Sequence, residues 1–282
     1  MRALARASQR SAVTGFSMLA TVGRARLGPM RSVHERALTL STMCRELCEL
    51  HQLRIIVTGD VPPGPIVVVA NHLSYLDPVV IAPAVEYLPI SKAEVATWPI
   101  LGDALRALGV LFVDRDDVYS CAKVLRAALR ILEEGTSILN FPEGTTTEGR
   151  MLPFRRGIFG AARIARVPVV PVAVGYESTE LYWTGNQTFM PHYWRTARRT
   201  STTAYLNFGE PMAPESSLSA EALAWEASER IRNLAQVTAS PGATTPSGGD
   251  ENDTADSIRI STPRTDTVFS ASDRPVGRPW QR

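Results

Sequence analysis

A run of apolar residues passes directly into a polar turn in the stretch Val67-Val68-Val69-Ala70-Asn71-His72-Leu73-Ser74-Tyr75-Leu76-Asp77-Pro78. The first four residues have the composition of a buried strand. Proline is favoured at the first helical position, and it disfavours helical geometry in the residue before it. The stretch therefore predicts a strand, a turn and the start of a helix, with Asp77 at the position of a helix N-cap.

His72 and Asp77 are the residues of this turn that can carry proton chemistry. They are five positions apart, which on a continuous helix would set them roughly 140° apart, so they can meet only through the turn. A histidine backed by a carboxylate is the usual general base near neutral pH, because the carboxylate fixes the tautomer and stabilises the imidazolium. On these two residues alone, a histidine packed at a strand end and an aspartate that only caps a helix is an equally good interpretation.

Strands and helices are expected to alternate outward from this stretch. Expected strands span residues 54–58, 66–70, 90–93, 110–113, 137–141, 169–174 and 203–208, and expected helices span residues 35–53, 78–87, 98–108, 118–134, 154–166 and 218–235. Short apolar strands that alternate with helices predict an α/β fold whose sheet is covered on both faces. The first helix is amphipathic; packing against the core is the favoured interpretation, and binding to a membrane surface is the alternative.

The two ends of the chain differ in composition from the middle. Residues 1–34 contain arginines but no acidic residue, and they predict a basic arm that is disordered or touches a membrane. Residues 238–282 are rich in Ser, Thr, Pro, Gly and Asp, and they predict a disordered tail, since so few apolar side chains cannot offset the entropy of ordering it. The folded domain is therefore expected at residues 35–237.

The composition is that of a globular domain. Hydrophobic residues make up 44% of the chain and the formal net charge is +2, so a sizeable core can form. No apolar run reaches the length of a membrane-spanning helix, so the protein is expected to be soluble or to lie on a membrane surface. Cys44, Cys48 and Cys121 lack metal-ligand spacing, and the first two are expected to be buried small hydrophobes in a reducing compartment. No metal site is predicted.

Four blocks of sequence resemble the signature blocks of the glycerophosphate and lysophospholipid acyltransferases, and they occur in that family's order. They are Asn71-His72 with Asp77, Gly109-Val110-Leu111-Phe112-Val113-Asp114-Arg115, Phe141-Pro142-Glu143-Gly144-Thr145 and Val167-Pro168-Val169-Val170-Pro171-Val172. One such block is weak support, whereas four in order are strong. The resemblance covers roughly residues 35–235 and is closest to the bacterial 1-acyl-glycerol-3-phosphate acyltransferases. It implies a glycerolipid acyltransferase-like fold with a mixed central sheet flanked by helices.

By this resemblance, His72 and Asp77 are the catalytic residues of an acyl transfer. The fatty acyl group would move from a thioester of coenzyme A or acyl carrier protein to the free hydroxyl of a lysophospholipid. His72 would take the hydroxyl proton, Asp77 would orient His72, and the alkoxide would attack the thioester directly. Because a thioester is already activated, positioning, a base and an oxyanion site are the main requirements. The thioester is a co-substrate, and no cofactor is expected.

The resemblance also implies that Asn71, Arg115, Glu143, Gly144 and Thr145 bind substrate. The arginine offers a planar donor fork that suits a phosphate, and its acidic neighbours make a solvated surface arginine the alternative. The glutamate is assigned to acceptor binding or to support of the site, with a turn-capping acid as the alternative. The glycine and the threonine can bring backbone N–H groups close to a phosphate or a developing oxyanion.

The chain departs from the family in its third block. Thr146 stands where the family usually has arginine, so one cationic contact to an acceptor phosphate is missing at that position. Arg150, Arg155 or Arg156 can supply the second cation, or the acceptor lacks a phosphomonoester.

The favoured acceptor is 1-acyl-glycerol-3-phosphate, whose acylation gives phosphatidic acid in phospholipid biosynthesis. The alternatives are another lysolipid such as lyso-ornithine lipid, a phospholipid transacylase, and a non-catalytic lipid-binding protein of the same fold. A lipid substrate and the basic N-terminus predict peripheral association with the cytoplasmic face of a membrane. Aromatic and basic residues between Trp183 and Arg199 predict a membrane-interface or lipid-headgroup patch, with an exposed loop as the alternative, and no nucleic-acid partner is expected.

Overall fold

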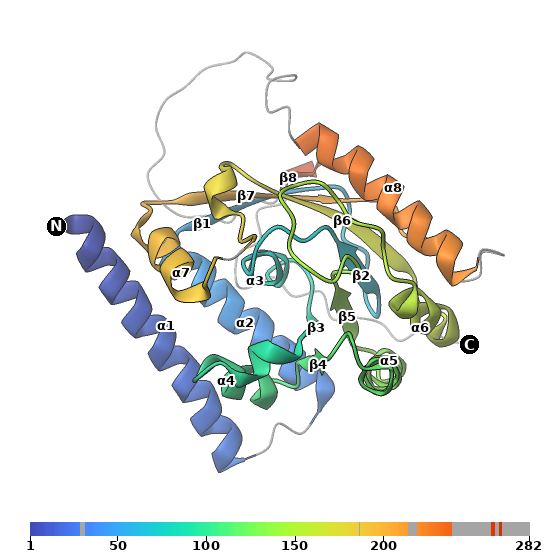
Figure 1. Cartoon of the computed structure of the whole chain (residues 1–282), viewed down its shortest axis with the longest axis horizontal. Coiled ribbons are helices and arrows are strands. Elements are labelled where there is room, and N and C mark those ends of the chain that lie inside the picture. The colour runs from blue at the N-terminus through green and yellow to red at the C-terminus, as the bar shows by residue number, and fades with distance from the viewer. Residues whose placement is uncertain (29–31, 186, 214–218, 239–260, 263–264, 267–282) are drawn as a thin grey trace.

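The computed structural model describes residues 1–28, 32–185, 187–213, 219–238, 261–262 and 265–266 (Figure 1). Within these ranges the chain forms a 7-stranded central sheet flanked by helices. The α/β class predicted from the alternating pattern is therefore confirmed. The tail predicted to be disordered from residue 238 lies almost wholly outside the described residues.

The central sheet has the strand order β1-β7-β6-β2-β5-β3-β4. Its strands are β1 (Leu53–Thr58), β2 (Val67–Ala70), β3 (Tyr87–Lys92), β4 (Leu111–Val113), β5 (Ser137–Asn140), β6 (Val169–Tyr176) and β7 (Thr202–Phe208), and a separate pair joins β8 (Ser261–Thr262) to β9 (Thr265–Asp266). Strands β6, β2, β5, β3 and β4 run parallel, β7 is antiparallel to β6, and β1 is parallel to β7. The mixed sheet implied by the family resemblance is thus confirmed. Since β2 lies at its centre, the turn after β2 opens at the carboxyl edge of the parallel strands, where ligands gather in such sheets.

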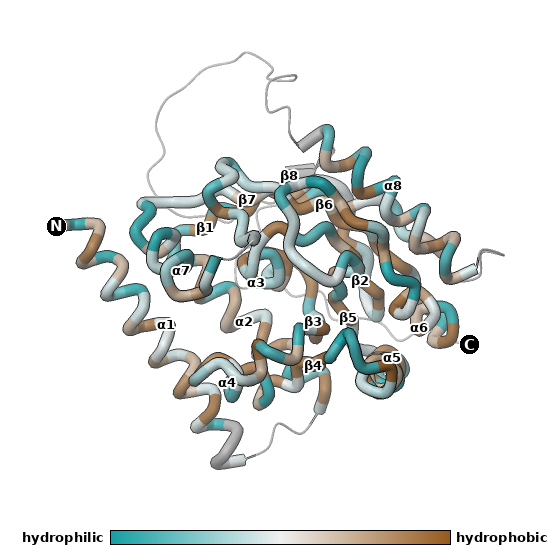
Figure 2. The backbone as a smooth tube through the Cα atoms, viewed as in Figure 1, coloured by the Kyte–Doolittle hydropathy of each residue, from teal (hydrophilic) through white to brown (hydrophobic). Residues whose placement is uncertain are grey.

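The helices are α1 (Arg2–Leu27), α2 (Val33–His51), α3 (Asp77–Ile81), α4 (Leu101–Ala107), α5 (Val118–Glu133), α6 (Gly157–Ala165), α7 (Phe189–Arg198) and α8 (Ala220–Thr238), with short 3-10 helices at Ala93–Thr97 and Thr179–Leu181. Helices α5, α6 and α8 pack together along one side of the sheet (Figure 1). Helices α2 and α3 cover the other side, and α1 lies outside them against α4 and α7. Hydrophobic residues concentrate along the central strands between these layers (Figure 2), and all residues of β2 are buried.

The predicted helix at residues 35–53 is α2, and it packs against the core. Leu40, Met43, Cys44 and Cys48 are buried on its inner face. The favoured core-packing interpretation is therefore confirmed, and so is the expectation that the two cysteines are small buried hydrophobes.

The helix predicted for residues 78–87 is wrong in its second half. α3 ends at Ile81, and β3 already begins at Tyr87. The Tyr87 side chain is buried, and its hydroxyl donates a hydrogen bond to the backbone carbonyl of Pro78. An apolar run of this length suits a short helix followed by a strand as well as one longer helix, and tertiary burial decides between them.

Residues 1–34 were expected to be an arm that is disordered or touches a membrane. The structure corrects the expectation of disorder for residues 2–27, because they form α1, a helix of 26 residues. Arg10 anchors it and is only 5% exposed. Its guanidinium donates hydrogen bonds to the backbone carbonyls of Leu50 at 2.9 Å, Ala197 at 3.2 Å, Arg199 at 2.7 Å and Thr200 at 3.4 Å. These carbonyls lie at the C-terminal ends of α2 and α7, where unpaired carbonyls favour a cation.

The inner face of α1 explains why its packing was missed. Among residues 2–24 of α1, the buried ones are Ala7, Arg10, Thr14 and Thr21, and they recur at helical spacing. They are small or polar, so the helix lacks the stripe of large apolar side chains by which an amphipathic helix is recognised.

Candidate active site

The turn between β2 and α3 is held by the carboxylate of Asp77. Its Oδ2 accepts hydrogen bonds from the backbone N–H groups of Leu73 at 2.7 Å and Ser74 at 2.9 Å. Asp77 is the first residue of α3 and Leu76 is the N-cap, so the predicted N-cap position is displaced by one residue. The carboxylate therefore bonds to the N–H groups of the turn that precedes the helix.

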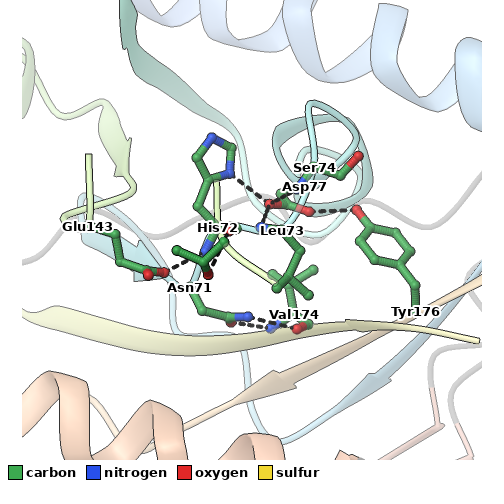
Figure 3. Close-up of polar contacts among 9 residues, drawn as sticks. Asn71, His72, Leu73, Ser74, Asp77, Glu143, Val174 and Tyr176 are labelled. Carbon is green, nitrogen blue, oxygen red and sulfur yellow. Dashed lines mark hydrogen bonds and ion pairs between the residues drawn. The ribbon is translucent and has the colours of Figure 1, made fainter. Parts of the chain in front are cut away.

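The His72 imidazole is fixed on two sides, by the Asp77 carboxylate (Figure 3) and by the Phe141 ring. Its Nδ1 lies 2.7 Å from Asp77 Oδ2, and its ring stacks on Phe141 with the ring centroids 4.1 Å apart. Because an ionised carboxylate can only accept hydrogen bonds, Nδ1 carries the proton and Nε2 keeps its lone pair. The His72 side chain is 18% exposed, whereas that of Asp77 is fully buried. The geometry thus leaves one basic nitrogen of a fixed imidazole available to a substrate.

Tyr176, which no sequence motif singled out, completes the environment of Asp77. Its hydroxyl donates a hydrogen bond of 2.7 Å to Asp77 Oδ1 from the end of β6 (Figure 3). Burial, followed by the negative charge of Asp77, raises the pKa of Tyr176 well above its usual value, so the phenol stays protonated and remains a donor. The only hint in the sequence is a tyrosine two residues after the strand expected at residues 169–174.

Asn71 and Glu143 hold the backbone on either side of this turn. Asn71 exchanges two hydrogen bonds with the backbone of Val174, of 2.7 and 3.0 Å. Glu143 accepts hydrogen bonds of 2.8 Å from the backbone N–H groups of His72 and Leu152, and burial raises the pKa of its carboxyl. Both side chains are buried and neither lines the cavity. Their contacts favour support of the site, which was one of the two roles expected for Glu143, over the substrate binding expected for Asn71.

His72 opens into a cavity of about 670 Å³ that lies between the sheet and the helices α1, α2, α4 and α7. This size is typical of a site for an extended small molecule. Much of its wall is aliphatic, with Met18, Leu40, Met43, Leu47, Ile90, Leu105 and Val110 among the lining residues. Arg115, Thr145 and Thr146 line the same cavity. A polar reaction centre therefore adjoins space suited to a hydrocarbon chain.

Two arginines flank Gly144 in the third block. A Cβ placed on this glycine would lie 3.4 Å from Arg155 Nε and 3.6 Å from Arg115 Cδ, and its φ of +84° is one that glycine adopts without strain. Burial, followed by the positive charge of Arg155, lowers the pKa of the Arg115 guanidinium. Arg156 forms an ion pair with Glu221, so its guanidinium is engaged elsewhere. Of the three candidates for a second cation, Arg155 is the one that the structure brings to Arg115.

The aromatic and basic segment after Trp183 belongs largely to α7, so the exposed-loop alternative is wrong for residues 189–198. Trp183, Phe189 and Tyr193 line the cavity. The Phe189 ring lies 4.9 Å from that of Tyr75 and 4.7 Å from that of Trp98, measured between centroids. These aromatic side chains build the wall of the cavity, although the sequence suggested a patch on the surface.

An imidazole held by a carboxylate, at the edge of a mixed α/β sheet and beside an apolar cavity, can remove a proton from a hydroxyl group on a lipid-like substrate. The Acyltransferase family pattern matches residues 54–175. The chain belongs to this family.

The relatives of the chain carry two kinds of name. The chain is 30% identical over 212 residues to the lyso-ornithine lipid O-acyltransferase of Brucella abortus. The aligned region covers 68% of this chain and 79% of that protein. It is 30% identical over 150 residues to the 1-acyl-sn-glycerol-3-phosphate acyltransferase of Neisseria gonorrhoeae, or 53% of this chain and 52% of that protein. The crystal structure of the 1-acyl-sn-glycerophosphate (LPA) acyltransferase PlsC from Thermotoga maritima shares the fold, with a TM-score of 0.63 and 23% identity over 85% of this chain and 98% of that one.

Proposed function

We propose that this protein transfers a fatty acyl group from an acyl thioester to the free hydroxyl of 1-acyl-glycerol-3-phosphate, which gives phosphatidic acid. The observation that supports this most directly is the Asp77-held imidazole of His72 on the wall of a largely apolar cavity that Arg115 also lines. This arrangement places a base, a cation and space for a hydrocarbon chain within one site. Membership of the acyltransferase family supports the same reaction class.

The reaction begins with His72 as the general base. Its Nε2 takes the proton of the acceptor hydroxyl as the hydroxyl oxygen bonds to the thioester carbonyl carbon. The resulting imidazolium is stabilised by Asp77, whose Oδ2 lies 2.7 Å from Nδ1. Tyr176, Leu73 and Ser74 donate to the same carboxylate and hold it in place.

Collapse of the tetrahedral intermediate completes the transfer. The carbon–sulfur bond breaks, and the thiolate of coenzyme A or acyl carrier protein leaves with the proton held by His72. Thr145 and Thr146 line the cavity next to Gly144, and their N–H or hydroxyl groups are candidates to bind the oxyanion. Nothing in this sequence of steps requires a covalent bond to the enzyme or a cofactor.

The acceptor phosphate is assigned to Arg115 and Arg155. A phosphomonoester carries close to two negative charges and is held best by more than one cationic donor. The two guanidinium groups flank Gly144, and neither forms an ion pair within the described part of the chain. Arg155 would thus replace the arginine that the family usually has at the position of Thr146.

A lyso-ornithine lipid is the second candidate acceptor. Thr146 and the Brucella abortus relative favour it, because an ornithine headgroup presents a carboxylate with one negative charge and needs fewer cationic donors. Either acceptor would be acylated through the same His72 chemistry. The choice between them depends on the headgroup contacts alone.

Peripheral binding to the cytoplasmic face of a membrane is proposed for delivery of the lipid. No helix in the described ranges is both long and apolar enough to cross a bilayer. α1 exposes Val13, Phe16 and Leu19 on its outer side, with Arg2 near its start, which is the composition of a surface that inserts shallowly into an anionic membrane. Flotation with anionic vesicles tests this: Phe16→Ser should reduce the bound fraction, and an unchanged fraction would contradict the proposed surface.

An acylation assay on purified protein tests the reaction. Acyl-coenzyme A and acyl carrier protein thioesters are each paired with lysophosphatidic acid and with lyso-ornithine lipid, and His72→Ala serves as the control. Higher kcat/KM with lysophosphatidic acid is expected. Higher kcat/KM with lyso-ornithine lipid would leave the acyl transfer standing and reassign the acceptor, and no turnover with any pair would refute the proposed function.

A further inference from the structure

One part of the cavity wall is polar, although much of the wall is apolar. Ser11 and Thr14 of α1, His51 of α2 and Tyr193 of α7 all line the cavity that contains His72. The three helices that supply them lie side by side, with α1 packed against both α2 and α7 (Figure 1). None of these residues belongs to the four sequence blocks of the family.

Three of these side chains form a closed triangle of hydrogen-bonding atoms. Thr14 Oγ1 lies 3.2 Å from His51 Nε2, the Tyr193 hydroxyl lies 3.3 Å from Thr14 Oγ1, and it lies 3.5 Å from His51 Nε2. Thr14 is 8% exposed and His51 is 9% exposed, so the triangle is shielded from bulk water. We refer to Ser11, Thr14, His51 and Tyr193 as the polar cluster.

The protons of the polar cluster can be counted. Burial, followed by the positive charge of Arg10, lowers the pKa of His51 to about 4, so the ring is neutral at neutral pH. A neutral ring can accept at Nε2 from the Thr14 hydroxyl, and Thr14 Oγ1 in turn accepts from Tyr193. Both hydroxyl protons are then used, while the oxygens of Tyr193 and Thr14 keep unused lone pairs. With His51 in the tautomer that accepts at Nε2, the triangle therefore has acceptors left for a further donor.

Ser11 carries a hydroxyl group that has no hydrogen-bond partner in the described ranges, next to the spare acceptors of the triangle. Its Oγ is buried and has no hydrogen-bond partner among the described residues. It precedes Thr14 by three positions, so the two side chains are neighbours on one face of α1. A buried hydroxyl without a partner costs free energy, and native structures seldom keep one without a reason. A hydroxyl group placed here would accept from Ser11 and donate to Tyr193 or Thr14.

We propose that the polar cluster is a binding subsite for a hydroxyl group carried on the aliphatic chain of a lipid substrate. This rests on the proposed function, because it assumes that such a chain occupies the cavity next to His72. A charged group does not fit: His51 is neutral, and the Arg10 guanidinium is engaged by backbone carbonyls. An unsubstituted chain fits by volume but leaves the Ser11 hydroxyl unpaired.

The hydroxyl can belong to the acyl donor or to the chain of the acceptor, so the test has two arms. In the first, full-length protein acylates a fixed acceptor with acyl thioesters of one length that are unsubstituted or carry a hydroxyl at successive positions. In the second, an unsubstituted donor is paired with acceptors whose own chain is plain or hydroxylated. The quantity measured is the ratio of kcat/KM for the hydroxylated chain to kcat/KM for the plain chain.

Ser11→Ala and Tyr193→Phe are the informative variants, and Ser8→Ala is the matched control. The Ser11 hydroxyl has no hydrogen-bond partner in the described part of the chain, so Ser11→Ala costs the fold little, and Tyr193→Phe keeps the ring that stacks on Phe189. Ser8 is an exposed serine on the same helix.

A site that hydrogen-bonds a substrate hydroxyl discriminates against the chain that lacks it. In either the donor arm or the acceptor arm, wild-type kcat/KM should be about tenfold higher for the hydroxylated chain than for the plain chain. Ser11→Ala and Tyr193→Phe should each lower this ratio by about three- to tenfold, while Ser8→Ala leaves it unchanged.

Equal kcat/KM for plain and hydroxylated chains in both arms would overturn the proposal. So would a preference that Ser11→Ala and Tyr193→Phe leave intact, since the cluster would then bind water or only tie the helices together. If no donor and acceptor pair gives turnover, the proposed acyl transfer fails, and calorimetric titration with hydroxylated and plain fatty acids still measures the subsite. Tighter binding of the hydroxylated acid that is lost in Ser11→Ala supports the subsite, and equal affinity refutes it.

Discussion

Two buried charged side chains, Asp77 and Arg10, are sequence neighbours of residues that line the cavity, and they obtain their hydrogen-bond partners in opposite ways. Asp77 lies in the turn after β2 and, apart from Tyr176, bonds to groups only three to five residues away along the chain. Arg10 lies on α1 and bonds to carbonyls 40 to 190 residues away. The turn thus carries most of its own partners, whereas α1 depends on α2, α7 and the residues before β7. The chemistry of the site is built locally, and its enclosure is built by tertiary packing.

The largest expected effect tests the local side of this comparison. His72→Ala should lower kcat by about a hundredfold or more, because the general base is lost. The fold should remain, since the turn is held by Asp77 and not by the imidazole. Steady-state kinetics with circular dichroism as the control measures both quantities. Asp77→Asn should also lower kcat, because an amide cannot stabilise the imidazolium, and near wild-type turnover in a folded His72→Ala protein would remove His72 from the mechanism.

The next largest effect tests the long-range hydrogen bonds of Arg10. Arg10→Met should lower the free energy of unfolding by about 3 to 4 kcal/mol, because four buried or partly buried carbonyls lose a charged donor at once. Arg6→Met is the matched control, since Arg6 donates one exposed hydrogen bond to the Arg198 carbonyl, and it should cost less than about 1 kcal/mol. Urea denaturation measures the two differences. Equal effects of the two variants would mean that α1 is not anchored by Arg10.

Acid should weaken the attachment of α1, because His51 lies between α1 and α7. The pKa of His51 is about 4 in the folded protein, against about 6.5 in an unfolded chain. Between these values the unfolded chain binds the proton and the folded chain does not, so stability falls as the pH drops from about 6.5 to about 4, by up to about 3 kcal/mol. The pKa of His192 is also lowered by burial and adds a loss of the same sign. His51→Gln should flatten the pH dependence of unfolding, and an unchanged slope would show that His51 is not the group that titrates.

The smallest expected effect tests which arginines beside the turn bind the acceptor phosphate. Arg115→Ala and Arg155→Ala should each raise KM for lysophosphatidic acid roughly ten- to a hundredfold, as expected for one charge-assisted hydrogen bond. Arg156→Ala is the control, because that arginine pairs with Glu221. Thr146→Arg should lower KM. If Arg155→Ala behaves like the control and Arg150→Ala is impaired instead, the second cation is Arg150.

The same division between local and long-range contacts decides what could be predicted from the sequence. The strand, the turn and the meeting of His72 with Asp77 could be predicted, because a β-branched run, a proline and a short spacing determine them. Tyr176 could not, because it reaches Asp77 from a strand that is 99 residues further along. The positions of Asn71 and Glu143 were found, yet their bonds to backbone groups carry no sequence signal that separates support from substrate binding.

The enclosure of the cavity could not be predicted for a related reason. Backbone carbonyls are the partners of Arg10, and every residue has one, so no side chain marks where the guanidinium will bind. The end of α3 and the start of β3 were missed because burial of Tyr87 decides between two structures that the local sequence permits equally.

The anchoring of Arg10 also has a consequence for biosynthesis. α1 is synthesised before α2 and α7, and three of its four anchoring carbonyls belong to residues 197–200. At about 5 to 20 residues per second, the helix waits roughly 10 to 40 seconds for them. During that interval Arg10 lacks these carbonyl partners and the apolar cavity lacks one wall. A nascent chain of this protein therefore presents a binding surface for chaperones, or for the membrane itself, that the finished molecule has closed.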